Sequence, residues 1–273
     1  MLPFAINHMT VPGLGYRELF RLAQSLGCIG VELRNDLDRP LFDGDDSASV
    51  LDAARDHGLR IVGLSQVYPF NAWSDAIRDE LSTLISNARS CGAETISLIP
   101  RNDGKGMADG ERQENVRRAL AAAKPILEDA GLLALVEPLG FPRTSSLSDK
   151  AETLGLIDEI DGGGVFKLVH DTFHHHLSGG GAVFPQRTGI IHVSGVVDRD
   201  LPRDEIADAH RVLIDDRDCL GNVEQIIALR RGGCEAPISI EAFSPEVHAL
   251  ADPERALRET MEHIRTSVAA SAA

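Results

Sequence analysis

Four apolar segments in the second half of the chain each end in an ionisable side chain. These are Glu137 after Leu-Ala-Leu-Val, Asp171 after Leu-Val-His, His192 after Ile-Ile, and Glu241 after Ile-Ser-Ile. A single buried carboxylate at such a place is explained equally well by an arginine or lysine partner. Three carboxylates and an imidazole that lie close together at the ends of buried strands would repel one another or take up protons. One divalent cation compensates the negative charge of all of them. The sequence therefore predicts one metal ion, bound by all four residues. The donor set suits Mn²⁺, Zn²⁺, Co²⁺ or Mg²⁺ and does not select among them.

The four segments belong to a series of eight strand-sized runs that alternate with helical patterns along the whole chain. The predicted strands are 4–7, 29–34, 60–67, 95–100, 132–139, 166–172, 189–194 and 238–243. Several are apolar on both faces, which suits a parallel sheet covered by helices. Eight β/α units in 273 residues predict an α/β fold, a (β/α)₈ TIM barrel that forms a single domain over residues 1–273. In such a barrel, catalytic groups come from the carboxyl ends of the strands.

A doubly wound open sheet is the alternative architecture. It would place a glycine-rich phosphate turn after an early strand. Residues 8–15, which follow the first predicted strand, lack the G-x-G-x-x-G spacing. The barrel is therefore favoured.

The segments around the four predicted ligands resemble a known family. They are 136–142 (Val-Glu-Pro-Leu-Gly-Phe-Pro), 169–176 (Val-His-Asp-Thr-Phe-His-His-His), 191–195 (Ile-His-Val-Ser-Gly) and 240–246 (Ile-Glu-Ala-Phe-Ser-Pro-Glu). The chain resembles, over essentially its whole length, the xylose isomerase-like TIM barrels of the sugar phosphate isomerase/epimerase family. Within that family it is most similar to the inosose (2-keto-myo-inositol) isomerases. The resemblance implies a Glu-Asp-His-Glu metal site at the same four positions.

The resemblance also implies a function in inositol catabolism, that of a metal-dependent isomerase that interconverts keto-inositols. The expected reaction is proton transfer through an enediolate of a small polyhydroxy ketone, with Glu137 and Glu241 as the catalytic acid and base. A ketose 3-epimerase is the main alternative, but Arg143 stands where those enzymes carry a further carboxylate. More remote alternatives are a metal-dependent endonuclease, which the acidic composition disfavours, and a non-catalytic sugar-binding barrel, which would be expected to lack a ligand.

Two substrate contacts follow from the same resemblance, at His174 and Arg211. His174 comes three residues after Asp171, so the two side chains lie close together if the segment is helical. The guanidinium of Arg211 suits adjacent hydroxyl or carbonyl oxygens. A surface ion pair with Asp215 or Asp216 is an equally good interpretation of this arginine.

Three further residues are predicted to contact the substrate from the ends of earlier strands. Glu32 and His8 end the second and first predicted strands, and Trp73, the one tryptophan, follows the third. The alternatives are pairs that close the end of the barrel for Glu32 and His8, and plain packing for Trp73.

The charge and cysteine content restrict the partners and the compartment. Lys and Arg number 27 against 42 Asp and Glu, and the net charge of −15 disfavours nucleic acid and anionic membranes as partners. The four cysteines are far apart, with no C-x-x-C pair, which suits a reducing compartment. No apolar run approaches the roughly 18 to 20 residues of a spanning helix. We predict a cytoplasmic protein with a small-molecule substrate, and the sequence leaves room for a homo-oligomer.

Overall fold

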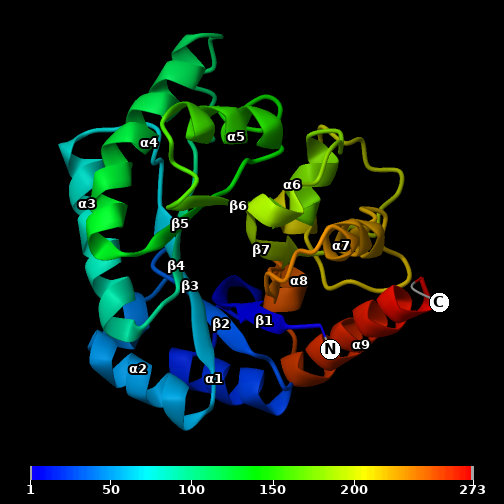
Figure 1. The fold of residues 1–273 in the computed structure, drawn as a ribbon. Helices are drawn as coiled ribbons and strands as arrows, with labels where there is room; N and C mark the ends of the chain where they lie inside the picture. Colours follow the sequence, from blue (N-terminus) through cyan, green and yellow to red (C-terminus); the bar gives the residue numbers. More distant parts are fainter. Residues whose placement is uncertain (1, 272–273) are drawn as a thin grey trace.

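The computed structural model, which describes residues 2–271, contains a closed barrel of eight parallel strands in chain order (Figure 1). The strands are β1 (Phe4–Asn7), β2 (Gly30–Arg34), β3 (Arg60–Val67), β4 (Thr95–Leu98), β5 (Leu133–Val136), β6 (Phe166–Asp171), β7 (Thr188–Val193) and β8 (Ile238–Ile240). Pairing of β8 with β1 closes the sheet. The predicted (β/α)₈ barrel in a single domain is confirmed, and the open-sheet alternative is wrong.

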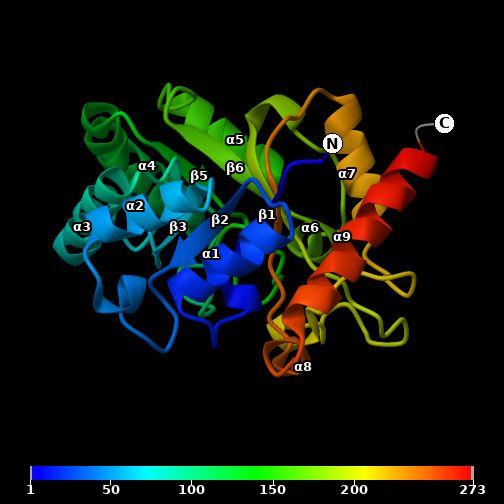
Figure 2. The ribbon, with the colours of Figure 1, turned by 90° about the horizontal axis from the view of Figure 1, so that it is seen from below.

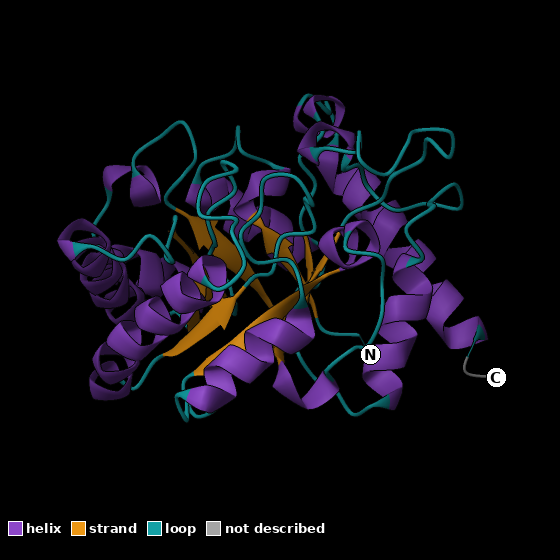
Figure 3. Ribbon diagram, turned by 90° about the horizontal axis from the view of Figure 1, so that it is seen from above, coloured by secondary structure: helices purple, strands orange, loops and turns teal. Residues whose placement is uncertain are grey.

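Helices surround the strands on all sides (Figures 1 and 3). They are α1 (Tyr16–Ser25), α2 (Ser47–Asp56), α3 (Asp75–Cys91), α4 (Glu111–Ala130), α5 (Lys150–Glu159), α6 (Thr172–Leu177), α7 (Asn222–Arg231), α8 (Pro245–His248) and α9 (Pro253–Ala270). Seen from below, the long α9 (red) crosses the outside of the molecule next to α7 (Figure 2). Of the helices within residues 2–271, none combines the length and the apolar character that crossing a membrane requires.

Local sequence explains where the helices begin and which face they bury. In α3, Ile77, Leu81 and Ala88 lie on one face and are buried, as the helical period requires. The hydroxyl of Ser74 caps that helix by accepting from the backbone N–H of Ile77. Such caps satisfy amides that have no partner within the helix.

Five strands end earlier than predicted, β6 and β7 by one residue and β4, β5 and β8 by two or three, because the carboxyl ends of these last three turn into loops. β4 stops at Leu98 and β5 at Val136, so that Glu137 lies one residue beyond its strand. β8 stops at Ile240, and the amides of Phe243 and Ser244 donate to the carbonyl of Arg211 in a loop instead of to a neighbouring strand. Glu137 and Glu241 therefore lie one residue beyond their strands, whereas Asp171 and His192 lie within β6 and β7.

The barrel interior is built in layers. Ala5, Val62, Leu135 and Ile190, from β1, β3, β5 and β7, form a separate apolar cluster with Val169 of β6. Residues from opposite strands can meet only inside the barrel, and layers contributed by alternate strands are typical of this fold. Side chains two residues further along a strand point to the same side. The next interior layer, toward the carboxyl ends, is therefore formed by the residues two positions later.

We predict that the substitution Gly140→Ala destabilises the fold. A Cβ at Gly140 would lie 2.3 Å from the carbonyl oxygen of His174 and 2.7 Å from the Cβ of Leu177, so α6 would have to move. Overpacking of this kind costs about 1–3 kcal/mol. Gly155→Ala is the matched control, because Gly155 lies within α5 with nothing near its would-be Cβ; it should stabilise the protein by roughly 0.5–1 kcal/mol. Urea unfolding measures both, and equal stability of the two variants would contradict the prediction.

Candidate metal centre and active site

A polar layer lies directly above the apolar layer of the barrel. Glu137, Asp171 and His192 follow Leu135, Val169 and Ile190 by two residues, and Asn7 follows Ala5 in the same way. Because side chains two residues apart on a strand point to the same side, these side chains also point into the barrel. The same alternation that fills the barrel with apolar side chains thus supplies the candidate site.

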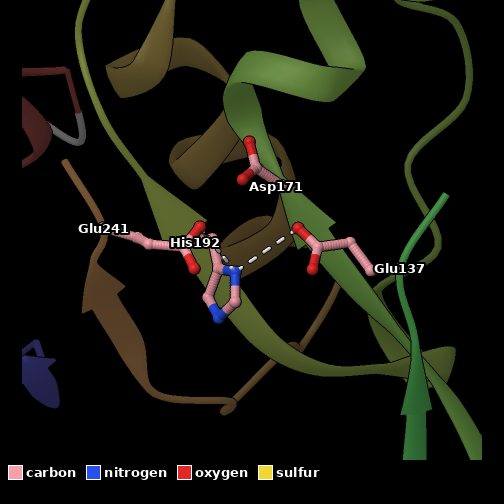
Figure 4. Close-up of side chains that lie close together, drawn as sticks. All are labelled: Glu137, Asp171, His192 and Glu241. Atoms are coloured by element: carbon pink, nitrogen blue, oxygen red, sulfur yellow. Dashed lines mark ion pairs between the residues drawn. The ribbon is translucent and has the colours of Figure 1, made fainter. Parts of the chain in front are cut away.

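The four residues predicted as ligands are brought together. Glu137, Asp171, His192 and Glu241 are all buried, and one ligand atom from each lies within 4.8 Å of the others. The Nδ1 atom of His192 is 3.5 Å from Oε1 of Glu137 and 3.2 Å from Oε2 of Glu241. Figure 4 shows the side chains converging from separate strands on one point.

The imidazole of His192 is held in one orientation. Its Nε2 lies 3.0 and 3.1 Å from the two carboxylate oxygens of Glu32. Its Nδ1 is buried and has no hydrogen-bond partner within the described chain. A carboxylate behind the imidazole is the usual second partner of a metal-binding histidine and leaves the other ring nitrogen free to bind the ion.

The carboxylates also change the protonation of His192. Burial lowers the pKa of the imidazole, but the negative charges of Glu241 and Glu32 more than offset that effect, so the pKa lies well above its ordinary value. Without a metal ion the ring is therefore charged at neutral pH.

The two carboxylate oxygens of Asp171 have different partners, one in helix α6 and one in the site. Oδ1 accepts from the backbone N–H groups of Phe173 and His174, at 2.7 and 3.1 Å, and so caps α6. Oδ2 accepts from Nη2 of Arg211 at 2.6 Å. The aspartate is fixed from both sides, and the helix that it caps carries His174.

Glu241 is the most heavily hydrogen-bonded of the carboxylates. Arg34 donates to Oε1 and Arg211 to Oε2, both at 2.8 Å, and Asn7 donates to Oε1 at 3.1 Å. Burial raises the pKa of Glu241, but His192 and the arginines outweigh it and hold the pKa well below its usual range. In contrast, Glu137 accepts no hydrogen bond from another side chain within residues 2–271 and faces His192.

These residues fit a divalent cation. The donor set is three carboxylates and one imidazole, and the imidazole nitrogen that faces the carboxylates is a buried polar atom without a partner. Hard and borderline ions accept such a set. An ion here would replace the proton on His192 as the positive charge among the carboxylates. Glu137, Asp171, His192 and Glu241 would hold it.

A pocket of about 210 Å³ opens beside the four residues. Glu137 and Glu241 reach it, and His174, Arg211 and Arg34 line its wall. Nδ1 of His174 is buried and unpartnered in the described structure, and the ring packs edge-on against Phe141 and Phe173. The pocket therefore offers donors and an unoccupied imidazole nitrogen next to the carboxylates.

Two predicted substrate residues, His174 and Arg211, lie in this pocket. Arg211 is 1% exposed and pairs with Asp171, Glu241 and, at its outer end, Asp208. The alternative of a surface pair with Asp215 or Asp216 is therefore wrong.

The structure places the other three predicted substrate residues away from this pocket. Glu32 lies behind His192 and orients it. The Nε2 atom of His8 is 2.9 Å from the carbonyl oxygen of Leu14. Trp73 lines a separate cavity.

Arg34 also belongs to the site, although it is not among the substrate contacts predicted from the sequence. It is buried, lines the pocket and binds Glu241. A signal was present, because Arg34 follows Glu32 by two residues on the same strand and so faces the same side.

Comparisons with known proteins agree with this architecture. The sequence model of the xylose isomerase-like TIM barrels matches residues 20–267. A xylose isomerase domain-containing protein from Salmonella typhimurium LT2 is 31% identical over 98% of this chain and 96% of that chain, with a TM-score of 0.86. The IolI protein, solved with a bound zinc atom, has a TM-score of 0.86 at 17% identity over 98% of this chain and 99% of that chain. The D-allulose 3-epimerase from Methylomonas sp., in complex with D-allulose, has a TM-score of 0.73 at 18% identity over 97% of each chain. No curated protein matches the chain in sequence.

We predict that binding of a divalent cation releases a proton from His192. The raised pKa means that Nδ1 is protonated at neutral pH and must lose its proton before it can bind an ion. Affinity for Mn²⁺ or Zn²⁺ should therefore rise with pH, by up to about tenfold per unit, and level off above the raised pKa. Calorimetry in buffers of different ionisation enthalpy should detect about one proton per ion.

The variant His192→Gln should abolish this proton release, whereas His263→Gln, on α9 and outside the site, should retain it. An affinity for Mn²⁺ that does not change with pH, without proton release, would contradict this prediction.

Proposed function

The chain belongs to the xylose isomerase-like TIM barrel family, and we propose that it is a divalent-metal-dependent isomerase that interconverts keto-inositols. The reaction would shift a proton between adjacent carbons of a cyclic hydroxyketone through an enediolate. The observation that carries the proposal is that two carboxylates, Glu137 and Glu241, both face Nδ1 of His192 at one pocket. The zinc atom bound by the structurally similar IolI protein supports a divalent ion.

A bound divalent cation would polarise a carbonyl and its neighbouring hydroxyl and stabilise the negative charge that develops on their oxygens. The protein groups orient the substrate. Arg211 and Arg34 hold fixed positive charges at the pocket wall. His174 presents an unpartnered ring nitrogen to a substrate hydroxyl. Positioning of this kind turns proton transfer into an intramolecular step.

We assign removal of the proton to Glu137. Its carboxylate has no side-chain donor within the described residues, so its lone pairs remain available. Glu241 is held as an anion by two arginines, and its depressed pKa makes it a weak base. Glu137 would hold the abstracted proton, which exchanges with solvent, and return it to the adjacent carbon, while the hydroxyl proton passes to the former carbonyl oxygen; this regenerates the Glu137 carboxylate. The arginines disfavour protonation of Glu241, so its main role is to orient Arg34 and Arg211 and to hold the ion.

No lysine is among the described residues that line the pocket, and this favours proton transfer over a hydride shift. Lys150 is buried, and its Nζ lies 3.2 Å from Nδ1 of the buried His170. Burial lowers the pKa of Lys150 to about 7. Lys150 is not among the residues that line the pocket, so we give it no role in polarising the substrate.

A ketose 3-epimerase is the second candidate function, supported by the fold shared with D-allulose 3-epimerase. Against it, Arg143 is exposed, pairs with Asp204 and does not line the pocket. It therefore cannot replace the additional carboxylate expected of the epimerases. The two functions differ in the carbon that exchanges its proton, which can be measured.

We predict that the protein with Mn²⁺ converts scyllo-inosose into an isomeric keto-inositol and incorporates one solvent deuterium at the carbon that receives the proton. NMR in D₂O detects both the isomer and the label. Transfer without deuterium would indicate a hydride shift. If scyllo-inosose is inert and a ketohexose is epimerised at carbon 3 instead, the protein is an epimerase.

We predict that Glu137→Gln and Glu241→Gln fail for different reasons. Loss of a general base lowers kcat by about 10²–10⁴-fold, so Glu137→Gln should be nearly inactive while its stability changes little. Removing one partner of a buried ion pair costs about 3–5 kcal/mol, so Glu241→Gln should also unfold at a lower urea concentration. Glu128→Gln, half-exposed on α4, is the control for the charge change. If Glu137→Gln keeps full activity, the assignment of the base is wrong.

A further inference from the structure

A second cavity, of about 270 Å³, lies beside the pocket of the metal centre. Three loops contribute residues to both cavities. Those after β3, β4 and β5 supply Tyr68, Asn102 and Glu137 to the first. The second cavity receives Trp73, Arg101 and Ser146 from these loops, and the face of α4 completes it.

The floor of the second cavity is a buried hydrogen-bond network that joins the three loops. Oδ1 of Asn71 accepts from the backbone N–H of Arg101 at 2.8 Å, and its Nδ2 donates to Oγ of Ser146 at 2.7 Å. The Ser146 hydroxyl donates in turn to the carbonyl of Arg101 at 3.1 Å. Asn71 and Ser146 are buried. The backbone that carries Arg101 is therefore fixed without a ligand, as a preorganised site requires.

The lining of this cavity is strongly basic, although the chain is acidic overall. Arg101, Lys105 and Arg118 contribute three cations, and among the lining residues Glu111 is the one carboxylate. Glu111 and Arg118 lie on the same face of α4, with Asn115 between them. In a chain of net charge −15, three cations around one cavity form a local field that attracts anions.

These cations are incompletely paired. Within residues 2–271, Arg118 has no carboxylate oxygen within 4.0 Å. Arg101 and Lys105 share one exposed partner, Asp103, at 3.0 and 4.0 Å. The Nε atom of Arg101 is buried and lacks an aligned acceptor in the described structure. The cavity thus has more donors than its own residues satisfy.

We propose that this cavity binds the phosphate group of a small phosphorylated molecule. Arginine and lysine together are the usual ligands of phosphate oxygens, arginine through its planar fork and lysine as a point charge. Asn115 adds an amide to the same wall, and the half-buried indole of Trp73 offers an apolar surface to the carbon skeleton. The site is distinct from the metal centre and does not depend on the proposed isomerase activity.

Trp73 makes the proposal directly measurable, because it is the one tryptophan of the chain and lines the cavity. Inorganic phosphate, titrated into the protein in the presence of a chelator that removes divalent ions, should change the indole emission saturably. Calorimetry of the same titration covers the case in which the bound anion leaves the emission unchanged.

Three variants and one control locate the binding. A hydrogen bond to a charged group contributes enough that Arg118→Gln and Lys105→Gln should each weaken phosphate binding roughly tenfold. Glu111→Gln removes the one carboxylate among the lining residues and should strengthen binding several-fold, a gain that misfolding cannot mimic. Arg117→Gln is the control for net charge, because Arg117 is next in sequence but pairs with Glu114 and Glu159.

Absence of saturable binding, or equal affinities in Arg118→Gln and Arg117→Gln, would overturn the proposal. Glycerol 3-phosphate distinguishes the two sources of the phosphate. Affinity that rises when Mn²⁺ is present would support a phosphate carried by the substrate across both cavities. Affinity independent of Mn²⁺ would support a separate effector. Because these measurements need no turnover, they remain valid if the isomerase proposal fails.

Discussion

The burial of like charges at the carboxyl end of the barrel is the constraint on which the rest of the structure depends. Glu32, Glu137, Asp171 and Glu241 are 1%, 6%, 1% and 2% exposed. Each buried carboxylate costs several kcal/mol unless positive charge or hydrogen bonds compensate it. Arg34, Arg211 and protonated His192 supply that compensation in the metal-free protein. The layer still has more carboxylates than cations, so it favours the arrival of a further positive charge.

This arrangement divides the carboxylates by role. One carboxylate oxygen of Asp171 caps α6, and this fixes His174 at the pocket wall. Both carboxylate oxygens of Glu32 contact Nε2 of His192 and orient its ring. Glu241 is bound by two arginines, which keep it ionised. Glu137 accepts no side-chain hydrogen bond within residues 2–271, so its oxygens are the ones left free to contact a substrate.

The fold and the convergence of Glu137, Asp171, His192 and Glu241 could be predicted from the sequence because both follow from local pattern. Apolar runs gave the strands, and residues that end successive parallel strands meet at one edge. The contacts across the barrel could not be predicted in this way. Glu32 on β2 meets His192 on β7 because of the barrel's closure and register, which leave no mark in either segment. Trp73 likewise lies after β3 as expected, but the loops divide the carboxyl end into two cavities, and it lines the second.

Pulsed electron paramagnetic resonance of the Mn²⁺-loaded protein, labelled with ¹⁵N-histidine, measures whether His192 binds the ion. We expect one ion per chain with coupling to a single imidazole nitrogen, and loss of that coupling in His192→Gln. Coupling that survives in His192→Gln, or coupling to more than one imidazole from the run at His174, His175 and His176, would contradict this expectation. So would an ion coordinated by oxygen alone.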